Sequence, residues 1–155
     1  MENLLNQIEC QIAEIELIYK SKVKASERAS IKTSKDAASL LQKNWDENKI
    51  DFIEQFKVIL LNRAHKVLGI FEASSGGVTG TLVDAKLVYS AALKANACAI
   101  IISHNHPSGN LKPSHADEQL TAKLKLGGTF LDIQLLDHII ITSERFFSFA
   151  DEGLL

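Results

Sequence analysis

Apolar residues three and four positions apart mark the helices of this chain. This spacing places side chains on one helix face, and it occurs in four segments: residues 1–12, 34–48, 85–95 and 114–126. The first segment is short and predicts only a lead-in helix or extension before the domain. Thr33 or Ser34 can cap the second and Asp84 the third. Gly127 and Gly128 are predicted to end the fourth.

Dense runs of β-forming residues lie between these helices. They predict strands at residues 13–19, 56–61, 67–71, 130–142 and 146–149. Segment 130–142 is long enough for one or two strands. Residues 62–66 supply turn residues and predict a hairpin. Residues 98–102 are continuously apolar, which is typical of a central strand covered on both faces. The polar segment 21–34 has no apolar periodicity and is predicted to be a loop.

Hairpin and crossover connections together predict an α/β fold, a mixed β-sheet with helices on its faces. The 155 residues fit one domain, residues 1–155, and a hydrophobic content of 46% is enough to fill its core. No apolar run approaches the roughly 18 residues that cross a bilayer. The N-terminus lacks a signal-peptide pattern. We therefore expect a cytoplasmic protein without membrane contact.

Charge and cysteine content narrow the possible partners. A formal net charge of −2 gives no overall attraction for nucleic acid. Basic residues nevertheless gather near the N-terminus, where they form either a solvated face or a nucleic-acid contact: Lys20, Lys22, Lys24, Arg28, Lys32 and Lys35. Cys10 and Cys98 lack a Cys or His neighbour at two-to-four-residue spacing, so thiolate metal ligation is not expected.

The segment 103–117 concentrates the residues that carry chemistry. Side chains two apart on an extended strand face the same side, so His104 and His106 can direct both imidazoles to one point. Asp117 falls in the first turn of the following helix and supplies an oxygen ligand. Two imidazoles and one carboxylate suit zinc, and three protein ligands leave a fourth position for water. The pattern predicts one Zn²⁺ ion with a bound water that serves as nucleophile.

Each part of this pattern also has a structural explanation. A lone His-x-His arises often by chance, and Ser114 with Asp117 fits a helix-start motif in which the acid favours the positive end of the dipole. Capping and metal ligation are compatible roles for Asp117. The conjunction with two upstream histidines is what favours a metal site.

The string His-x-His, seven residues, Ser, two residues, Asp resembles the JAMM motif of JAB/MPN metallopeptidases, with matches at His104, His106, Ser114 and Asp117. His-Asn-His-Pro-Ser-Gly, with Leu136-Asp137-His138 and Ser148-Phe149-Ala150 downstream, is similar to the RadC-like branch in particular. The resemblance covers residues 13–155 and implies a JAB/MPN (cytidine-deaminase-like) architecture. A helix-hairpin-helix region, usual in RadC proteins, has no room in these 155 residues.

This resemblance implies a zinc metallopeptidase that hydrolyses a peptide or isopeptide bond in a peptide or protein-conjugate substrate. It further implies Glu72 as the upstream acid that moves the proton of the nucleophilic water, and Ser114 as a donor to the developing oxyanion. The alternatives are a DNA-associated repair accessory or nuclease that uses the same metal site, and a scaffold without catalysis. A zinc nucleoside deaminase is excluded because the His-x-Glu and Pro-Cys-x-x-Cys ligands are missing.

The other three histidines are assigned structural positions. His65 lies in the predicted turn and should be exposed. His115 neighbours the capping serine and should point away from Asp117, since adjacent helix residues are about 100° apart. His138 lies in an apolar strand, which favours a hydrogen-bonded core histidine. A supporting role behind the metal ligands is left open for both His115 and His138.

Overall fold

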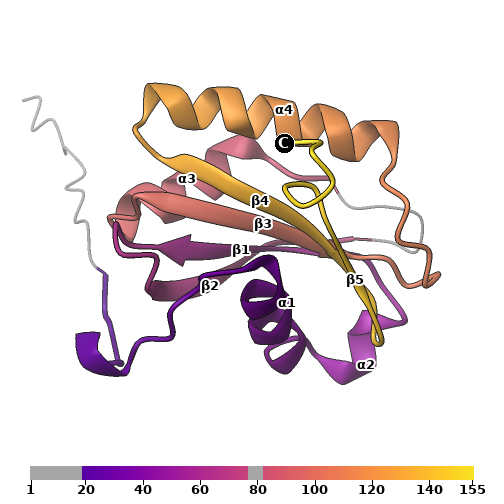
Figure 1. Ribbon diagram of the computed structural model, residues 1–155, viewed down its shortest axis with the longest axis horizontal. Helices are drawn as coiled ribbons and strands as arrows, with labels where there is room; N and C mark the ends of the chain where they lie inside the picture. Colours follow the sequence, from indigo (N-terminus) through magenta and orange to yellow (C-terminus); the bar gives the residue numbers. More distant parts are fainter. Residues whose placement is uncertain (1–18, 77–81) are drawn as a thin grey trace, which may run out of the picture.

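The computed structural model describes residues 19–76 and 82–155, which form one mixed sheet with helices on both faces (Figure 1). The strands follow the order β2-β1-β3-β4-β5. Their bounds are β1 Gln55–Leu61, β2 Val67–Ser75, β3 Ala99–Asn105, β4 Gln134–Ile141 and β5 Phe146–Ser148. Only β3 and β4 pair in parallel, and the other neighbours are antiparallel. The predicted α/β class is confirmed.

The helices divide between the two faces of this sheet. The described helices are α1 Ser34–Lys43, α2 Glu47–Ile50, α3 Ala85–Lys94 and α4 His115–Phe130, with a short 3₁₀ turn at Ala25–Glu27. Residues of α3 and α4 pack with Phe56, Val58 and Ile102 in one core. Residues of α1 pack with Ile59 and Ile101 in another. Figure 1 shows α3 and α4 on one side of the strands and α1 on the other.

The register between β1 and β3 decides which side chains share a face. Phe56 lies opposite His104, and Lys57 lies opposite Ser103. Directly opposite residues point to the same side of a sheet, and successive residues alternate. His104 therefore belongs to the α3/α4 face, whereas Lys57 belongs to the α1 face. This alternation separates two polar clusters that are close along the strands.

Several sequence predictions are confirmed. Residues 56–61 and 67–71 form the hairpin β1–β2, although β2 continues to Ser75. Asp84 caps α3 through a hydrogen bond from the amide of Lys86, 2.9 Å away. The predicted loop 21–34 is irregular up to residue 33, apart from its 3₁₀ turn and one bridge from Ser30 to Lys66, and Ser34 begins α1. The lead-in at 1–12 and nearly all of the strand predicted at 13–19 lie outside the described residues.

Two boundary predictions are wrong. Gly127 and Gly128 do not end α4, which continues to Phe130. A Cβ atom on Gly128 would lie 2.2 Å from the carbonyl oxygen of Ile133, so this glycine permits a close approach of the backbone that follows the helix. The helix predicted at 34–48 is α1, which ends at Lys43 rather than near Asn48. The buried Trp45 lies after the end of this helix.

Segment 130–142, for which one or two strands were predicted, contains the single strand β4. Between residues 19 and 155, the gap at 77–81 excepted, no helix is long and apolar enough to cross a membrane.

Candidate metal centre

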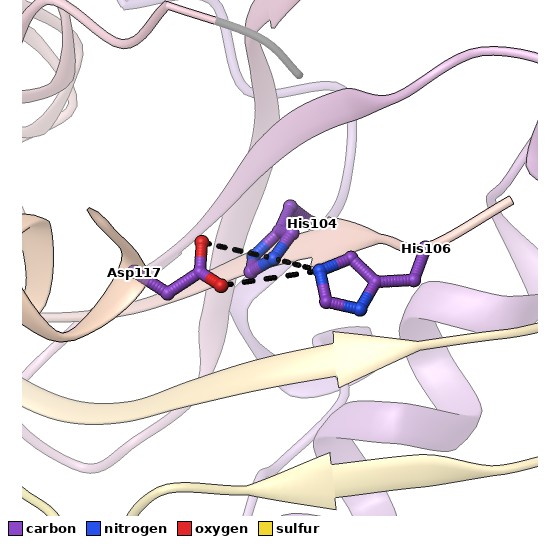
Figure 2. A group of neighbouring side chains, drawn as sticks. All are labelled: His104, His106 and Asp117. Carbon is purple, nitrogen blue, oxygen red and sulfur yellow. Dashed lines mark hydrogen bonds and ion pairs between the residues drawn. The ribbon is translucent and has the colours of Figure 1, made fainter. Parts of the chain in front are cut away.

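His104, His106 and Asp117 converge at the C-terminal end of β3 (Figure 2). His104 is the last but one residue of β3, and His106 directly follows this strand, where its amide donates to the carbonyl of Ile141 at 3.0 Å. Asp117 comes from the first turn of α4. The loop 107–113 between them contains both prolines of the chain and a left-handed Gly109, with φ of 77°. That loop turns the chain back so that the helix start faces the strand end.

The three side chains are close enough to share one ion. His104 Nε2 lies 2.9 Å from His106 Nε2 and 3.3 Å from Asp117 Oδ1, and His106 Nε2 lies 3.9 Å from Asp117 Oδ2. Because zinc lies about 2.0–2.2 Å from nitrogen and oxygen ligands, two ligand atoms of one ion are at most about 4.4 Å apart. All three distances satisfy that limit, and the donor set is one that zinc accepts. The residues therefore fit a divalent cation.

Asp117 combines two functions in one carboxylate. The Ser114 amide and hydroxyl both donate to Asp117 Oδ2 at 2.7 Å, and the Asp117 amide donates to Ser114 Oγ at 3.1 Å, which completes a capping box. Burial raises the pKa of Asp117, but the contact with His104 and the hydrogen bonds from Ser114 hold the pKa well below its usual range. A cation bound at this point would act on the carboxyl in the same direction.

The Nδ1 atoms of His104 and His106 point away from the centre, and each contacts another group of the protein. His106 Nδ1 lies 2.5 Å from the carbonyl oxygen of Asn110 in the loop. His104 Nδ1 lies 2.8 Å from Nε2 of His138, which is fully buried on β4. Burial and the neighbouring His104 hold the pKa of His138 well below its usual range, so His138 is neutral. The predicted hydrogen-bonded core position of His138 is confirmed.

Asn105, between the two histidines, secures the strand end from the opposite face. Its buried side chain donates to the carbonyls of Ile50 and Ile53 and accepts from the amide of Gln55 at 2.7 Å. Both amide hydrogens and the oxygen of this side chain are thus engaged within the protein. Asn105 thereby fixes the segment before β1 to the strand that presents the histidines.

Glu72 is not brought together with the other predicted site residues. It pairs with Lys57 across β1 and β2 and therefore points to the α1 face, away from His104. Its carboxylate accepts from Gln55 Nε2 at 3.0 Å and lies 3.7 Å from Lys57 Nζ. A bulge after Phe56 sets this register. The expected position of Glu72 beside the histidines is thus corrected by the pairing of the strands.

Another acid, Glu54, directly precedes β1. Its carbonyl accepts from the amide of Gly76 at 2.9 Å, which continues the pairing with β2. The pairing of β1 with β3 ends at Phe56 and His104, and the same register extended by two residues would put Glu54 opposite His106. Glu54 was not among the residues predicted from the sequence. Its sequence signal is an acid two residues before Phe56, and the meaning of this signal depends on the pairing of β1 with β3.

The remaining candidates occupy peripheral positions. His65 and His115 are exposed as predicted, and His115 pairs with Glu118 at 3.8 Å rather than with Asp117. Cys98 is exposed with a free thiol. A cavity of about 740 Å³ lies beside Cys98 and Lys125 at the other end of β3, and no residue of the metal centre lines it.

The fold and site define an α/β domain that presents a His₂Asp centre at a strand end. A family model described as "RadC-like JAB domain" matches residues 31–154, and the chain belongs to this family. The resemblance seen in the motifs is confirmed.

Relatives agree with this assignment. A "UPF0758 protein" of Flavobacterium johnsoniae is 44% identical over 124 residues, which is 80% of this chain and 53% of that protein. Proteins of the same name from Porphyromonas gingivalis and Clostridium beijerinckii are 45% and 38% identical over 66% and 81% of this chain, and 45% and 53% of their own lengths. This chain therefore spans about half the length of the curated relatives it matches, and their shared name states no activity.

Proposed function

We propose that this chain is a zinc-dependent hydrolase that cleaves a peptide or isopeptide bond. The observation that carries the proposal is the convergence of His104 Nε2, His106 Nε2 and an Asp117 oxygen within 4.8 Å of one another at a strand end. Zinc held there would supply a Lewis acid and lower the pKa of its water to about 7. The membership in a JAB family supports hydrolysis as the reaction class.

The protein's own residues divide the remaining work. His104, His106 and Asp117 hold the ion, and the hydrogen bonds of Ser114 fix the orientation of Asp117. We assign the proton transfer from the nucleophilic water to the leaving nitrogen to Glu54, and the register of β1 on β3, extended by two residues, supports this assignment. The Ser114 hydroxyl, at the N-cap of α4 beside Asp117, is the proposed donor to the oxyanion, a role for which its one hydrogen turns from Asp117 Oδ2 to the substrate.

Elemental analysis followed by hydrolysis assays tests this function. The purified chain should contain close to one zinc ion per molecule and should cleave members of a mixed peptide library or of a set of isopeptide-linked conjugates. A chelator should abolish cleavage and added Zn²⁺ should restore it. Asp117→Ala serves as the inactive control. Chelator-sensitive cleavage of DNA without cleavage of amides would reject the peptidase and favour the nuclease, and bound zinc without any hydrolysis would reject both.

A further inference from the structure

We propose that His138 and Thr121 are positioning residues that keep His104 in the tautomer whose Nε2 is free to bind a divalent cation. This inference rests on the metal site of the proposed function, but not on which bond that site cleaves. It follows from counting which atom donates and which accepts along a chain of buried contacts. The chain joins β3, β4 and α4, and β3 and β4 lie side by side beneath α4 (Figure 1).

The chain begins at a carbonyl oxygen, which can only accept. Thr121 Oγ1 lies 2.6 Å from the main-chain oxygen of Asp117, one helical turn earlier, so the Thr121 hydroxyl donates its single hydrogen there. The same Oγ1 lies 2.6 Å from Nδ1 of His138. With its hydrogen already used, Thr121 must accept in this contact. Nδ1 of His138 therefore carries the proton.

The contact between His138 and His104 decides which nitrogen of His104 carries the proton. The ring nitrogens of His138 contact only Thr121 and His104 among the residues described, and the ring stacks on Phe149 with centroids 4.5 Å apart. A second proton on this fully buried ring would create a charge that no carboxylate contacts, which is costly. Nε2 of His138 is therefore an acceptor. His104 Nδ1, 2.8 Å away, has to donate to it.

The result is that His104 presents a lone pair on Nε2 toward His106 and Asp117. His106 reaches the same tautomer by a different contact, since its Nδ1 faces the carbonyl of Asn110. The two Nε2 atoms are 2.9 Å apart. Two lone pairs and a carboxylate at such distances repel one another unless a proton or a cation lies among them. A main-chain carbonyl thus orients one ligand, and a buried side-chain relay orients the other.

Zinc affinity and the tautomer of His104 together test the relay. His138→Leu removes the acceptor, and we expect a roughly 10–100-fold weaker Zn²⁺ affinity, as is typical when a partner behind a ligand is lost. His138→Gln keeps an amide oxygen toward His104 and an amide N–H toward Thr121, and should bind within a few-fold of the original. Thr121→Val should weaken binding and Thr121→Ser should restore it. Affinity is measured by competition with a chromophoric chelator.

Histidine ¹⁵N correlation spectra of the metal-free protein give a readout that a merely structural role would not change. The original chain should show the proton of His104 on Nδ1, and Thr121→Val should reduce this preference. His115→Gln is the matched control, because His115 is exposed and contacts Glu118 instead of the relay. It should change neither affinity nor tautomer.

Either of two results would overturn the relay. One is a proton on Nε2 of His104 in the metal-free original chain. The other is unchanged zinc affinity in a folded His138→Leu protein, or in Thr121→Val if the leucine variant does not fold. Neither readout requires hydrolysis. A chain that binds zinc through this relay but cleaves no amide would therefore contradict only the proposed function.

Discussion

Two polar clusters lie on opposite faces of the same sheet, and their acids have different partners. On the α1 face, Glu72 has its own cation, Lys57, whose Nζ also lies 4.6 Å from the Trp45 ring centre and donates to the Asn44 carbonyl. On the α3/α4 face, two histidines and Asp117 gather lone pairs.

No Lys or Arg pairs with that second cluster in the described part of the chain, since the ion pairs of Asp117 are with histidines. The difference indicates that Glu72 is a structural acid, whereas Asp117 belongs to a group that could bind a cation from outside the chain.

The largest effect should come from removing the acid of the second cluster. Asp117→Ala should abolish stoichiometric zinc binding, because a three-ligand site loses its only carboxylate. It also removes a capping box, which costs about 0.5–2 kcal/mol of stability. Zinc content after dialysis and urea denaturation measure the two effects separately.

Asp36→Ala is the matched control, since Asp36 forms the same capping box with Thr33 at the start of α1. It should lose comparable stability and no zinc affinity. If both variants kept their zinc, the assignment of Asp117 as a ligand would be withdrawn.

The next largest effect should come from replacing Glu54 by glutamine, with the same replacement of Glu72 on the other face as its comparison. Glu54→Gln should keep zinc and lower kcat by about 10²–10⁴-fold, the range expected when a general base is lost. Glu72→Gln should leave kcat within a few-fold, because its carboxylate contacts Gln55 and Lys57 on the other face. Steady-state kinetics on a cleaved peptide compare the two. The reverse order of effects would restore Glu72 to the mechanism.

Removing the cation of the first cluster should affect stability alone. Lys57→Met loses a half-exposed ion pair and a cation–π contact, together about 1–2 kcal/mol. Zinc affinity and turnover should stay the same, because Lys57 faces α1. Urea denaturation and the chelator competition give both numbers. A drop in zinc affinity would mean that the two faces are coupled through the strands.

The smallest effect concerns Asp137, a buried acid of the α1 face with hydrogen bonds and no cation. Burial raises the pKa of Asp137, and hydrogen bonds from Ser148 and Ala150 offset this only in part. An acid with a raised folded-state pKa loses stability as pH rises through that value. Asp137→Asn should therefore gain on the order of 0.5–1 kcal/mol at neutral pH. The gain should vanish in acid; a pH series of urea midpoints measures it.

Periodicity and caps predicted most of the fold, because α3, β3 and the β1–β2 hairpin are specified by their own residues. Long-range contacts account for the errors. Gly128 looks like a helix end in sequence, yet the approach of the Ile133 carbonyl is what requires it. Glu72 was predicted to be the proton-transfer acid at the end of the second hairpin strand. The bulge after Phe56 and the pairing of β1 with β3 decide to which face of the sheet its side chain points. No local pattern encodes either contact.

The hydrogen bonds of Asn105 have a consequence for how the candidate centre would bind an ion. Because this amide ties the histidine-bearing strand to the carbonyls of Ile50 and Ile53, the fold itself holds the strand end that carries both histidines. Zinc fingers, by contrast, fold only as they capture their metal. In this chain the proposed ion would therefore bind to an already folded scaffold and could exchange without unfolding, and the rigidity of the site would help to select the metal.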